Sequence, residues 1–392
     1  MDELAQLTNA SATFEDVAEN GPPAAPLNFP DPTVGRAARV TATVFNPATG
    51  EGATVPNVIF EDKSGQPPSR AYWIGRKLKK AIYGCVRSCT VLKLREGGSN
   101  ASGEHEGTAW EVTPEMAAVK IMDWNAINEL RGRHMEDPVK EVSAMQFISL
   151  NGGHPNVMGC KDVLSDNKYL YSFMPFCTCG ELFGYVDRDG RFTEPVTRWW
   201  FRQLINGLYH LQKMGVCHRD LSLENILVDQ YTKSLIIDMG MCLRVPFGGD
   251  DDDSITDVSA GTLRRLMTPQ GQCGKPNYIS PEVLKNTDSF DGFAIDVWAA
   301  GIILFIMLVG LPPFEWANRE DPRFRMITGG GLMRMLTQWQ RPISPEAGDL
   351  LQRMLREDPR ERLSLVEIMD HAWVVNDDVA EPTPPQEEGW RS

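Results

Sequence analysis

The spacing of apolar residues changes along the chain, and this change limits the folds that it can adopt. In the front part, β-branched residues alternate with other residues in short runs, as over 117–122 and 168–174. Further on, apolar residues recur at helical spacing, as over 196–214 and 296–309. A strand-rich front followed by a helix-rich back predicts an α+β protein of two lobes with a cleft between them.

The domain boundaries follow from the same pattern and from composition. Residues 1–70 are rich in Ala, Pro, Asn, Gly and Thr, which predicts a mostly disordered extension. Within it, the alternation over 39–45 and 55–60 is also compatible with an appended hairpin. We therefore predict an extension over 1–70, a folded domain over 71–376 (lobes of about 71–176 and 177–376) and an acidic, disordered tail over 377–392.

Charge and cysteine content limit the kinds of partner and the cellular compartment. A formal net charge of −14 argues against nucleic-acid partners and anionic membranes. The eight cysteines are scattered, and no basic-then-apolar leader opens the chain, which favours a reducing compartment: the cytoplasm, with the nucleus left open. The apolar run 297–311 is shorter than the roughly 20 residues that a bilayer needs, so it predicts a buried helix and not a membrane span.

One short loop carries the strongest chemical signal, His218-Arg219-Asp220-Leu221-Ser222-Leu223-Glu224-Asn225. Asp220 is suited to accept the proton of a hydroxyl nucleophile, and Asn225 offers an oxygen to Mg²⁺. Asp238 follows the apolar run 235–237, where a carboxylate can bridge metal ions bound to phosphates. The sequence therefore predicts phosphoryl transfer.

In this order, the motifs resemble those of the protein kinase family, from about Tyr72 to Trp373. The resemblance implies a two-lobed fold with its active site in the cleft: a small lobe of antiparallel strands with one main helix, over about 138–150, and a larger helical lobe. It also implies ATP and Mg²⁺ as substrate and cofactor. Lys120 would hold the α- and β-phosphates and pair with Glu141, and Arg362 would pair with Glu282 as a structural contact.

The resemblance assigns the remaining nucleotide-binding residues. Met174 would guard the back of the adenine pocket, and Phe176 would lie in the hinge. The full predicted set for ATP is Lys79, Ala81, Gly84, Val86, Ala118, Lys120, Glu141, Met174, Phe176 and Leu227, with Asn225 and Asp238 for the metal.

The phosphate-covering loop departs from the family pattern G-x-G-x-x-G-x-V. Here the segment 79–86 reads Lys-Lys-Ala-Ile-Tyr-Gly-Cys-Val, so only the third glycine, Gly84, remains. Side chains at the other positions limit how closely the backbone can approach phosphates, and Lys79 would offset this loss in part by its charge. In addition, Met239 stands where the family has Phe, which is a mild change.

Two further departures concern the residues beside Asp220. Ser222 stands where serine/threonine kinases carry a lysine, and Lys275 stands where they carry a threonine. Our hypothesis is that Lys275 reaches back to Asp220 and the γ-phosphate, so that the charge of the active site is unchanged. The alternative is that Lys275 points into solvent.

The sequence also suggests residues for regulation and substrate choice. Gly271 occupies the usual phosphorylation position, so we predict Thr268 as the modified residue, with Arg219 binding its phosphate. Autophosphorylation and an upstream kinase both remain open, and the acidic run 250–253 is either a permanent substitute for the phosphate or a solvated insertion. Glu181 matches a position that contacts a basic residue of the substrate.

Three functions were weighed on these residues. An active serine/threonine kinase, somewhat like the calcium/calmodulin-dependent group and acting on protein substrates, is favoured because Lys120, Glu141, Asp220, Asn225 and Asp238 are all present. The alternative is a pseudokinase that serves as a nucleotide-binding scaffold or allosteric partner. A kinase for tyrosine or small molecules ranks third.

Overall fold

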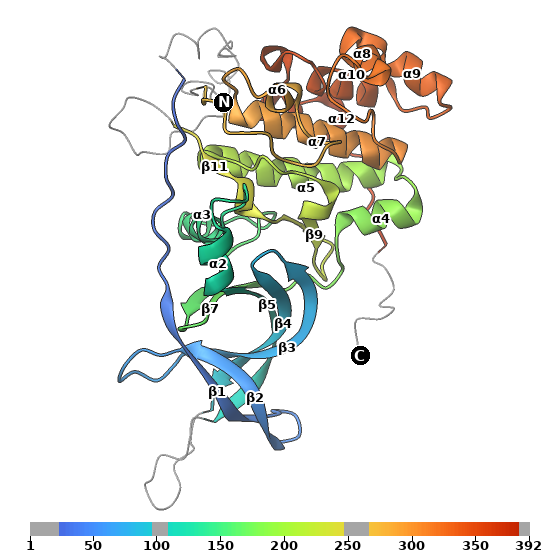
Figure 1. Cartoon of the computed structure of the whole chain (residues 1–392). Coiled ribbons are helices and arrows are strands. Elements are labelled where there is room, and N and C mark those ends of the chain that lie inside the picture. Colours follow the sequence, from blue (N-terminus) through green and yellow to red (C-terminus); the bar gives the residue numbers. More distant parts are fainter. Residues whose placement is uncertain (1–22, 96–108, 247–265, 384–392) are drawn as a thin grey trace, which may run out of the picture. The chain divides into compact units, whose positions relative to one another are not determined.

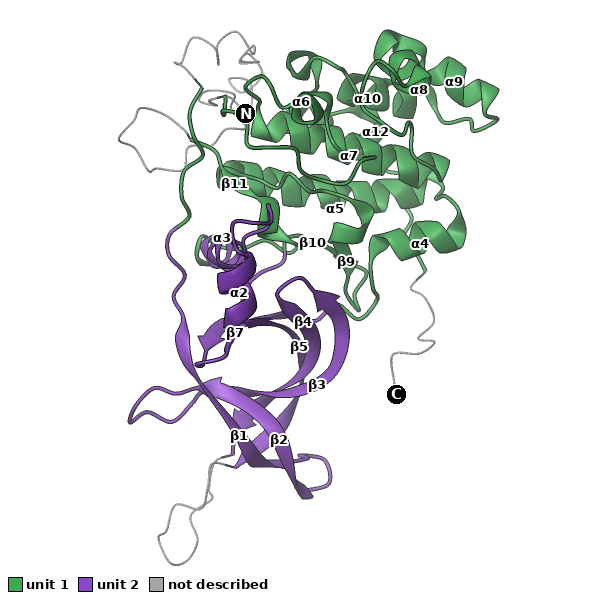
Figure 2. Ribbon diagram, viewed as in Figure 1, with its two compact units in different colours: residues 1–29, 150–157, 177–392 green, residues 30–149, 158–176 purple. Residues whose placement is uncertain are grey.

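The structure, a computed structural model, describes residues 23–95, 109–246 and 266–383. The chain divides into two compact units, which Figure 2 colours separately. Unit 1 contains residues 1–29, 150–157 and 177–392, and unit 2 contains residues 30–149 and 158–176.

Unit 2 is built on one sheet with the strand order β1-β2-β3-β4-β5-β7-β6. A short helix follows β5 directly and a longer one precedes β6, so the predicted small lobe with one main helix is present. The elements are β1 (Gly35–Phe45), β2 (Gly52–Glu61), β3 (Arg70–Ala81), β4 (Gly84–Leu94), β5 (Trp110–Asp123), α2 (Trp124–Leu130), α3 (Pro138–Leu150), β6 (Asp162–Ser165) and β7 (Tyr169–Pro175).

The β1–β2 hairpin closes this sheet into a barrel (Figure 1). On one side, β2 pairs with β3 in an antiparallel ladder that sets Val58 opposite Trp73. On the other side, β1 runs parallel to β6, with Gly35 opposite Leu164. The hairpin therefore covers both edges of the sheet β3-β4-β5-β7-β6, and edges left open are sites of unwanted pairing.

The sequence prediction of a mostly disordered extension over 1–70 differs from the structure, which has regular strands between residues 35 and 61. The alternative interpretation, an appended hairpin, agrees with the structure. Val44 and Val58 are buried in one cluster with Leu92 and Trp110. The many polar residues of these strands suggested disorder. In the structure they face outward, and the alternating apolar residues fill the barrel.

Unit 1 is mostly helical. Its longer helices are α4 (Leu182–Asp189), α5 (Glu194–Lys213), α7 (Gly292–Val309) and α10 (Pro345–Met354). The shorter elements are β8 (Val216–Cys217), η2 (Leu223–Asn225), β9 (Ile226–Val228), β10 (Ser234–Ile236), η3 (Met239–Met241), β11 (Leu243–Arg244), α6 (Pro281–Lys285), α8 (Pro322–Met326), η5 (Ile327–Gly331), α9 (Leu332–Gln338), η6 (Pro359–Glu361), α11 (Leu365–Met369) and α12 (Ala372–Val375).

Helix α7 is the core of unit 1. Asp291 caps its start by accepting hydrogen bonds from the backbone N–H groups of Phe293 and Ala294, and Gly310 ends it with a φ of 89°. By length and composition this helix is apolar enough to cross a membrane, but all of its residues are buried inside the unit. The predicted buried helix is confirmed.

Two contacts fix the C-terminal part of unit 1. The predicted pair of Arg362 and Glu282 is present as a two-pronged ion pair, with N–O distances of 2.6 and 2.8 Å. The chain after α12 also lies along α5, where the Arg202 guanidinium donates to the carbonyls of Val374 and Asn376.

The predicted disordered tail over 377–392 differs from the structure in its first residues. The Arg198 guanidinium donates to the carbonyl of Asp378, and the Ala380 N–H donates to the carbonyl of Pro195. These contacts use the backbone of the tail, so its acidic composition gave no sign of them. Residues 384–392 lie outside the described part of the chain.

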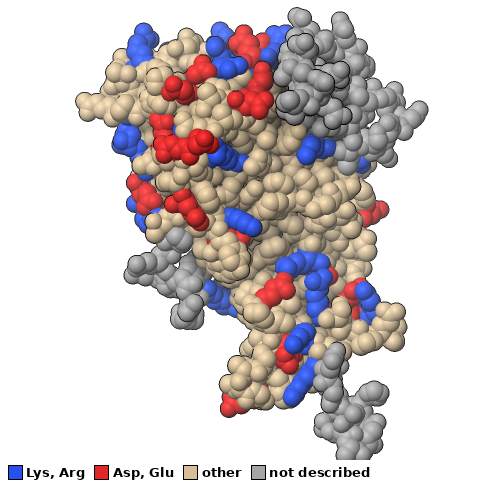
Figure 3. All heavy atoms as spheres, turned by 180° about the vertical axis from the view of Figure 1, so that it is seen from behind, with Lys and Arg blue, Asp and Glu red and all other residues tan. Residues whose placement is uncertain are grey.

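On the face that Figure 3 shows, acidic and basic side chains are interspersed. The net charge of −14 is therefore not collected into a single acidic region on this face.

Candidate functional site

The loop 218–225 follows β8 in unit 1 and is anchored by a buried carboxylate. Asp296 on α7 accepts hydrogen bonds from the backbone N–H groups of His218 (2.6 Å) and Arg219 (2.9 Å). The His218 ring nitrogen Nε2 lies 2.8 Å from the carbonyl oxygen of Ile237. Burial raises the pKa of Asp296 to about 6, partly offset by His218 and Arg219. The loop is therefore held by the core helix and by the strand that leads to Asp238.

Asp220 and Asn225 are in direct contact on this loop. The Asn225 amide nitrogen donates to the Asp220 carboxylate (3.0 Å) and to the Asp220 carbonyl (2.7 Å), which turns the Asn225 amide oxygen away from Asp220. Burial raises the pKa of Asp220 to about 6; Lys275 lowers it and the nearby charge of Asp238 raises it. A desolvated carboxylate of this kind is suited to hold a hydroxyl group and accept its proton.

Asp238 lies directly after the strand β10 and Ile237. Its backbone is left-handed, with a φ of 69°, and its carboxylate accepts a hydrogen bond from the N–H of Gly240 (3.3 Å). The N–H of Ile237 donates to the carbonyl of Asn225 (3.0 Å), which ties the two segments together. Asp238 and Asn225 thus offer hard oxygen donors of the kind that Mg²⁺ prefers, and these residues fit that ion.

Lys275 contacts the residue with which we paired it in the sequence. Its ammonium group donates to the Ser222 hydroxyl at 2.6 Å and forms an ion pair with Glu224 at 3.2 Å. It acts on Asp220 through space, by lowering the pKa of that carboxyl. The side chains at the two exchanged positions, 222 and 275, therefore meet beside the loop 218–225, whereas the reach of Lys275 to the γ-phosphate stays a prediction.

In unit 2, the predicted ion pair of Lys120 and Glu141 is present. Lys120 on β5 and Glu141 on α3 are 2.5 Å apart, and their side chains are only 14% and 9% exposed. The pairing of a β-strand lysine with a glutamate on the main helix is one of the conditions for catalysis in protein kinases.

The predicted adenine-contacting residues of unit 2 share one face of the sheet. Val86 lies opposite Lys120 on the neighbouring strand, and Ala118 lies opposite Met174. Ala118 and Lys120 are two residues apart, so all four side chains point the same way. Leu227 belongs to unit 1, where it forms a bridge with Glu181.

The phosphate-loop region is a tight hairpin whose tip is fixed to unit 2. Ala81 lies opposite Gly84, so Ile82 and Tyr83 form the turn. Tyr83 is 2% exposed, and its hydroxyl donates to the carbonyl of Glu136 at 2.8 Å. The Tyr83 carbonyl accepts from the N–H of Asp123 at 2.9 Å. Sequence reasoning missed this role of Tyr83; the only signal was an aromatic residue at the expected tip.

The close packing of two strands explains why position 84 is glycine. A Cβ atom at this position would lie 2.0 Å from the carbonyl oxygen of Ile121 on the adjacent strand. The close approach of β4 and β5 therefore requires glycine here, whether or not a nucleotide binds. Lys79 is exposed on the same hairpin.

The structure does not bring the predicted regulatory residues into hydrogen-bonding contact. The Arg219 guanidinium donates to the carbonyls of Met241 (3.4 Å) and Gly271 (3.2 Å). The Thr268 hydroxyl accepts from the Gln270 side chain at 3.2 Å. The acidic run 250–253 lies outside the described residues.

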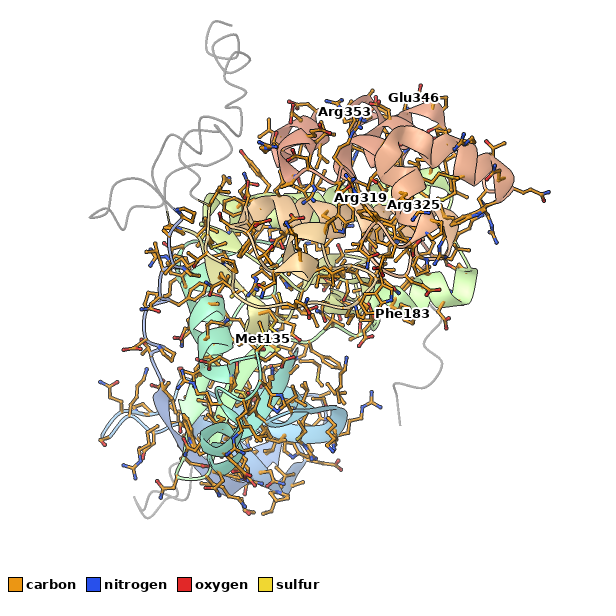
Figure 4. All side chains as sticks on the ribbon, turned by 45° about the horizontal axis from the view of Figure 1, so that its top comes forward. Met135, Phe183, Arg319, Arg325, Glu346 and Arg353 are labelled. Atoms are coloured by element: carbon orange, nitrogen blue, oxygen red, sulfur yellow. The ribbon has the colours of Figure 1, made fainter. Side chains whose placement is uncertain are left out.

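Glu181 is followed closely in sequence by an exposed aromatic side chain. Glu181 precedes α4, and Phe183, in the first turn of that helix, is 43% exposed (Figure 4). The contact of Glu181 with a basic residue of a substrate stays a prediction.

The sheet-based unit with its buried lysine–glutamate pair and the helical unit with its aspartate–asparagine loop define the two-lobed kinase fold. Residues 98–374 match the family described as "Protein kinase domain". The chain belongs to the protein kinase family. The match begins after β3 and β4, the strands that hold the altered glycine loop.

Curated relatives agree with this assignment. The chain is 32% identical over 307 residues to "CBL-interacting protein kinase 1" of Oryza sativa subsp. japonica, covering 78% of this chain and 56% of that protein. It is 34% identical over 264 residues to "CBL-interacting serine/threonine-protein kinase 26" of Arabidopsis thaliana, covering 67% and 53%. It is 32% identical over 286 residues to "Serine/threonine-protein kinase SRK2C" of Arabidopsis thaliana, covering 71% and 74%.

The chain thus spans little more than half the length of the first two relatives. The predicted resemblance to serine/threonine-type kinases, somewhat like the calcium/calmodulin-dependent group, is confirmed by these matches.

Proposed function

We propose that this chain is an active kinase that transfers the γ-phosphoryl group of ATP to serine and threonine hydroxyls of protein substrates. The observation that carries the proposal is the loop in which Asn225 orients the partly buried Asp220 carboxylate, tied through the backbone to Asp238. The names of the relatives support serine and threonine as acceptors.

In the proposed mechanism, most catalysis is positioning and electrostatics. Lys120, held by Glu141, binds the α- and β-phosphates. Asp220 aligns the substrate hydroxyl and accepts its proton as the oxygen bonds to phosphorus and the bond to the ADP oxygen breaks. Asn225 and Asp238 would hold Mg²⁺, which when bound neutralises charge on the phosphate oxygens.

Lys275 supplies the positive charge that other serine/threonine kinases place at position 222. Its contact with Ser222 and its effect on the Asp220 carboxyl support this role. Glu181 is proposed to bind a basic residue of the substrate, and Thr268 is proposed to be phosphorylated, by the kinase itself or by an upstream kinase.

A pseudokinase is the second candidate, and the phosphate-loop hairpin is the observation in its favour. Two of the family's glycines are absent there, and the tip is fixed by Tyr83. A hairpin of this kind would still cover a nucleotide but would follow its phosphates less closely.

Phosphate transfer from labelled ATP and Mg²⁺ to a peptide library containing Ser, Thr and Tyr tests the proposal. The parent should modify Ser and Thr peptides, and Asp220→Asn should abolish the signal. Asp187→Asn, which neutralises an exposed carboxylate on α4, is the matched control and should keep it. Nucleotide binding by folded parent protein without any transfer would favour the pseudokinase.

Modification of Thr268 requires a separate measurement. Mass spectrometry of the parent and of Asp220→Asn, produced in the same host, distinguishes the two sources. Phosphate on Thr268 in the inactive variant would identify an upstream kinase, and its presence in the parent alone would identify autophosphorylation.

A further inference from the structure

A short segment near the N-terminus pairs with residues of the activation segment, which runs from Asp238 to Glu282. These residues directly follow positions 247–265, which lie outside the described part of the chain. We call residues 23–29 the N-terminal strap. The N–H of Ala24 donates to the carbonyl of Leu266 (2.9 Å), and the N–H of Thr268 donates back to the carbonyl of Ala24 (3.0 Å). Together they form a parallel bridge between Ala24 and Met267.

The same strap also pairs with the residues that precede positions 247–265. The N–H of Leu27 donates to the carbonyl of Arg244 on β11 (2.9 Å), and the Arg244 guanidinium donates to the carbonyl of Asn28 (3.2 Å). Figure 2 accordingly colours these first residues with unit 1, although the hairpin that follows them in sequence belongs to unit 2.

The two paired positions are themselves joined to the catalytic machinery of unit 1. Leu243 of β11 lies opposite Cys217, the residue before the catalytic loop. Met267 is fully buried and exchanges two backbone hydrogen bonds with Phe290, at 2.9 and 3.0 Å. The strap thus holds both flanks of residues 247–265 against fixed parts of the unit.

The composition of the strap suits this task. Pro23 and Pro26 stand immediately before Ala24 and Leu27, the two residues whose N–H groups bond to the activation segment. Proline favours an extended backbone and lowers the conformational entropy that ordering would cost. The prolines that suggested disorder are therefore compatible with a preformed extended strand.

The activation segment of this chain lacks the usual phosphorylation position that orders it in other kinases. In other kinases it is ordered by a phosphate that binds arginine. In this chain Gly271 occupies the usual position of modification, and the Arg219 guanidinium already donates to the carbonyls of Gly271 and Met241.

We propose that the N-terminal strap is a built-in regulatory element that holds the two flanks of residues 247–265 by pairing with Arg244 and Met267, independently of any phosphate on Thr268. This inference rests on the proposed kinase activity and adds to it how the substrate-binding segment is held. A loss of the strap would free both flanks of residues 247–265 and weaken the binding of protein substrates.

Two truncations of the full chain test the proposal. Removal of residues 1–29 deletes the strap, whereas removal of residues 1–22 keeps it and is the matched control. Hydrogen exchange of the peptide containing Thr268 should become at least about tenfold faster in the longer truncation only, because the amide of Thr268 loses its acceptor. The KM for a peptide substrate should rise in parallel, with the KM for ATP unchanged.

A second pair of variants guards against misfolding of the longer truncation. Ala24→Pro removes the N–H that donates to Leu266, whereas Ala25→Pro adds the same ring at an exposed neighbouring position. Faster exchange is expected for Ala24→Pro alone.

Equal exchange at Thr268 in both truncations and in both proline variants would overturn the pairing. Faster exchange with an unchanged peptide KM would mean that the strap stabilises the segment without affecting substrate binding. That result would overturn the regulatory proposal. If no form of the protein transfers phosphate, the kinase proposal fails, and the exchange rates still decide whether the strap holds the segment.

Discussion

The catalytic loop of unit 1 and the phosphate-loop hairpin of unit 2 fulfil their family pattern to very different degrees. The loop 218–225 keeps its aspartate and asparagine, and its backbone is bonded to the buried Asp296. The hairpin 79–86 has lost two glycines, and its turn is fixed instead by Tyr83.

The difference teaches which parts of a motif can be replaced. Proton transfer and metal binding need particular functional groups at particular points, so no other side chain substitutes for the Asp220 carboxylate. Covering a phosphate needs only a backbone of suitable shape and some positive charge, and packing can supply the shape. Lys275 and Ser222 are an intermediate case. A positive charge is needed at one point, but because the side chains at positions 222 and 275 are in contact, a lysine at either position can supply it.

The largest effect is expected for Lys120→Met in unit 2. Loss of the ammonium group removes the proposed phosphate contact and the ion pair with the buried Glu141 carboxylate. We expect kcat/KM to fall by about 10²–10³-fold in steady-state assays. Lys79→Met on the exposed hairpin should lower it far less, because the backbone of the hairpin would still cover the phosphates. Equal losses in the two variants would contradict the distinction between functional groups and backbone shape.

Gly84→Ala tests why the hairpin retains this one glycine. The added methyl group would collide with the carbonyl of Ile121, so the free energy of unfolding of unit 2 should fall by about 1–3 kcal/mol. Denaturant titration measures it. Ala81→Gly, opposite Gly84 in the hairpin, is the control and should not cause this collision. A stable Gly84→Ala protein with weakened ATP binding would show that Gly84 serves the phosphates instead.

Lys275→Ala tests the exchanged charge in unit 1. The variant should lose activity by roughly tenfold, comparable to one charge-assisted hydrogen bond. The double variant Ser222→Lys/Lys275→Thr should recover it, because the charge returns to the same place from the other position. Full activity of Lys275→Ala in the labelled-ATP assay would end the hypothesis.

The smallest effect is expected for Tyr83→Phe. Removing the hydroxyl that donates to Glu136 should lower the stability of the hairpin by about 1 kcal/mol, and hydrogen exchange over 79–86 should quicken. Tyr231→Phe, at an exposed tyrosine of unit 1, is the control. Unchanged exchange in Tyr83→Phe would mean that packing alone holds the tip.

Much of the candidate site could be predicted because its residues are adjacent in sequence or lie on regular elements. Asp220 and Asn225 share one loop, and Lys120 sits in an apolar strand whose period places it with Ala118. The contact of Arg219 with a phosphate on Thr268 stays a prediction, because it depends on a modification and not on the fold alone.

The amino-acid sequence by itself determined the family, the two kinds of lobe, the candidate catalytic residues and the meeting of positions 222 and 275. These features follow from periodicity and from local motifs. Only the tertiary structure decided that the β1–β2 hairpin closes the barrel, that Tyr83 fixes the phosphate loop and that the strap 23–29 pairs with the activation segment. Each of these depends on backbone groups that meet across a long stretch of chain. Every residue offers a carbonyl and, proline excepted, an N–H, so these groups leave little trace in the sequence.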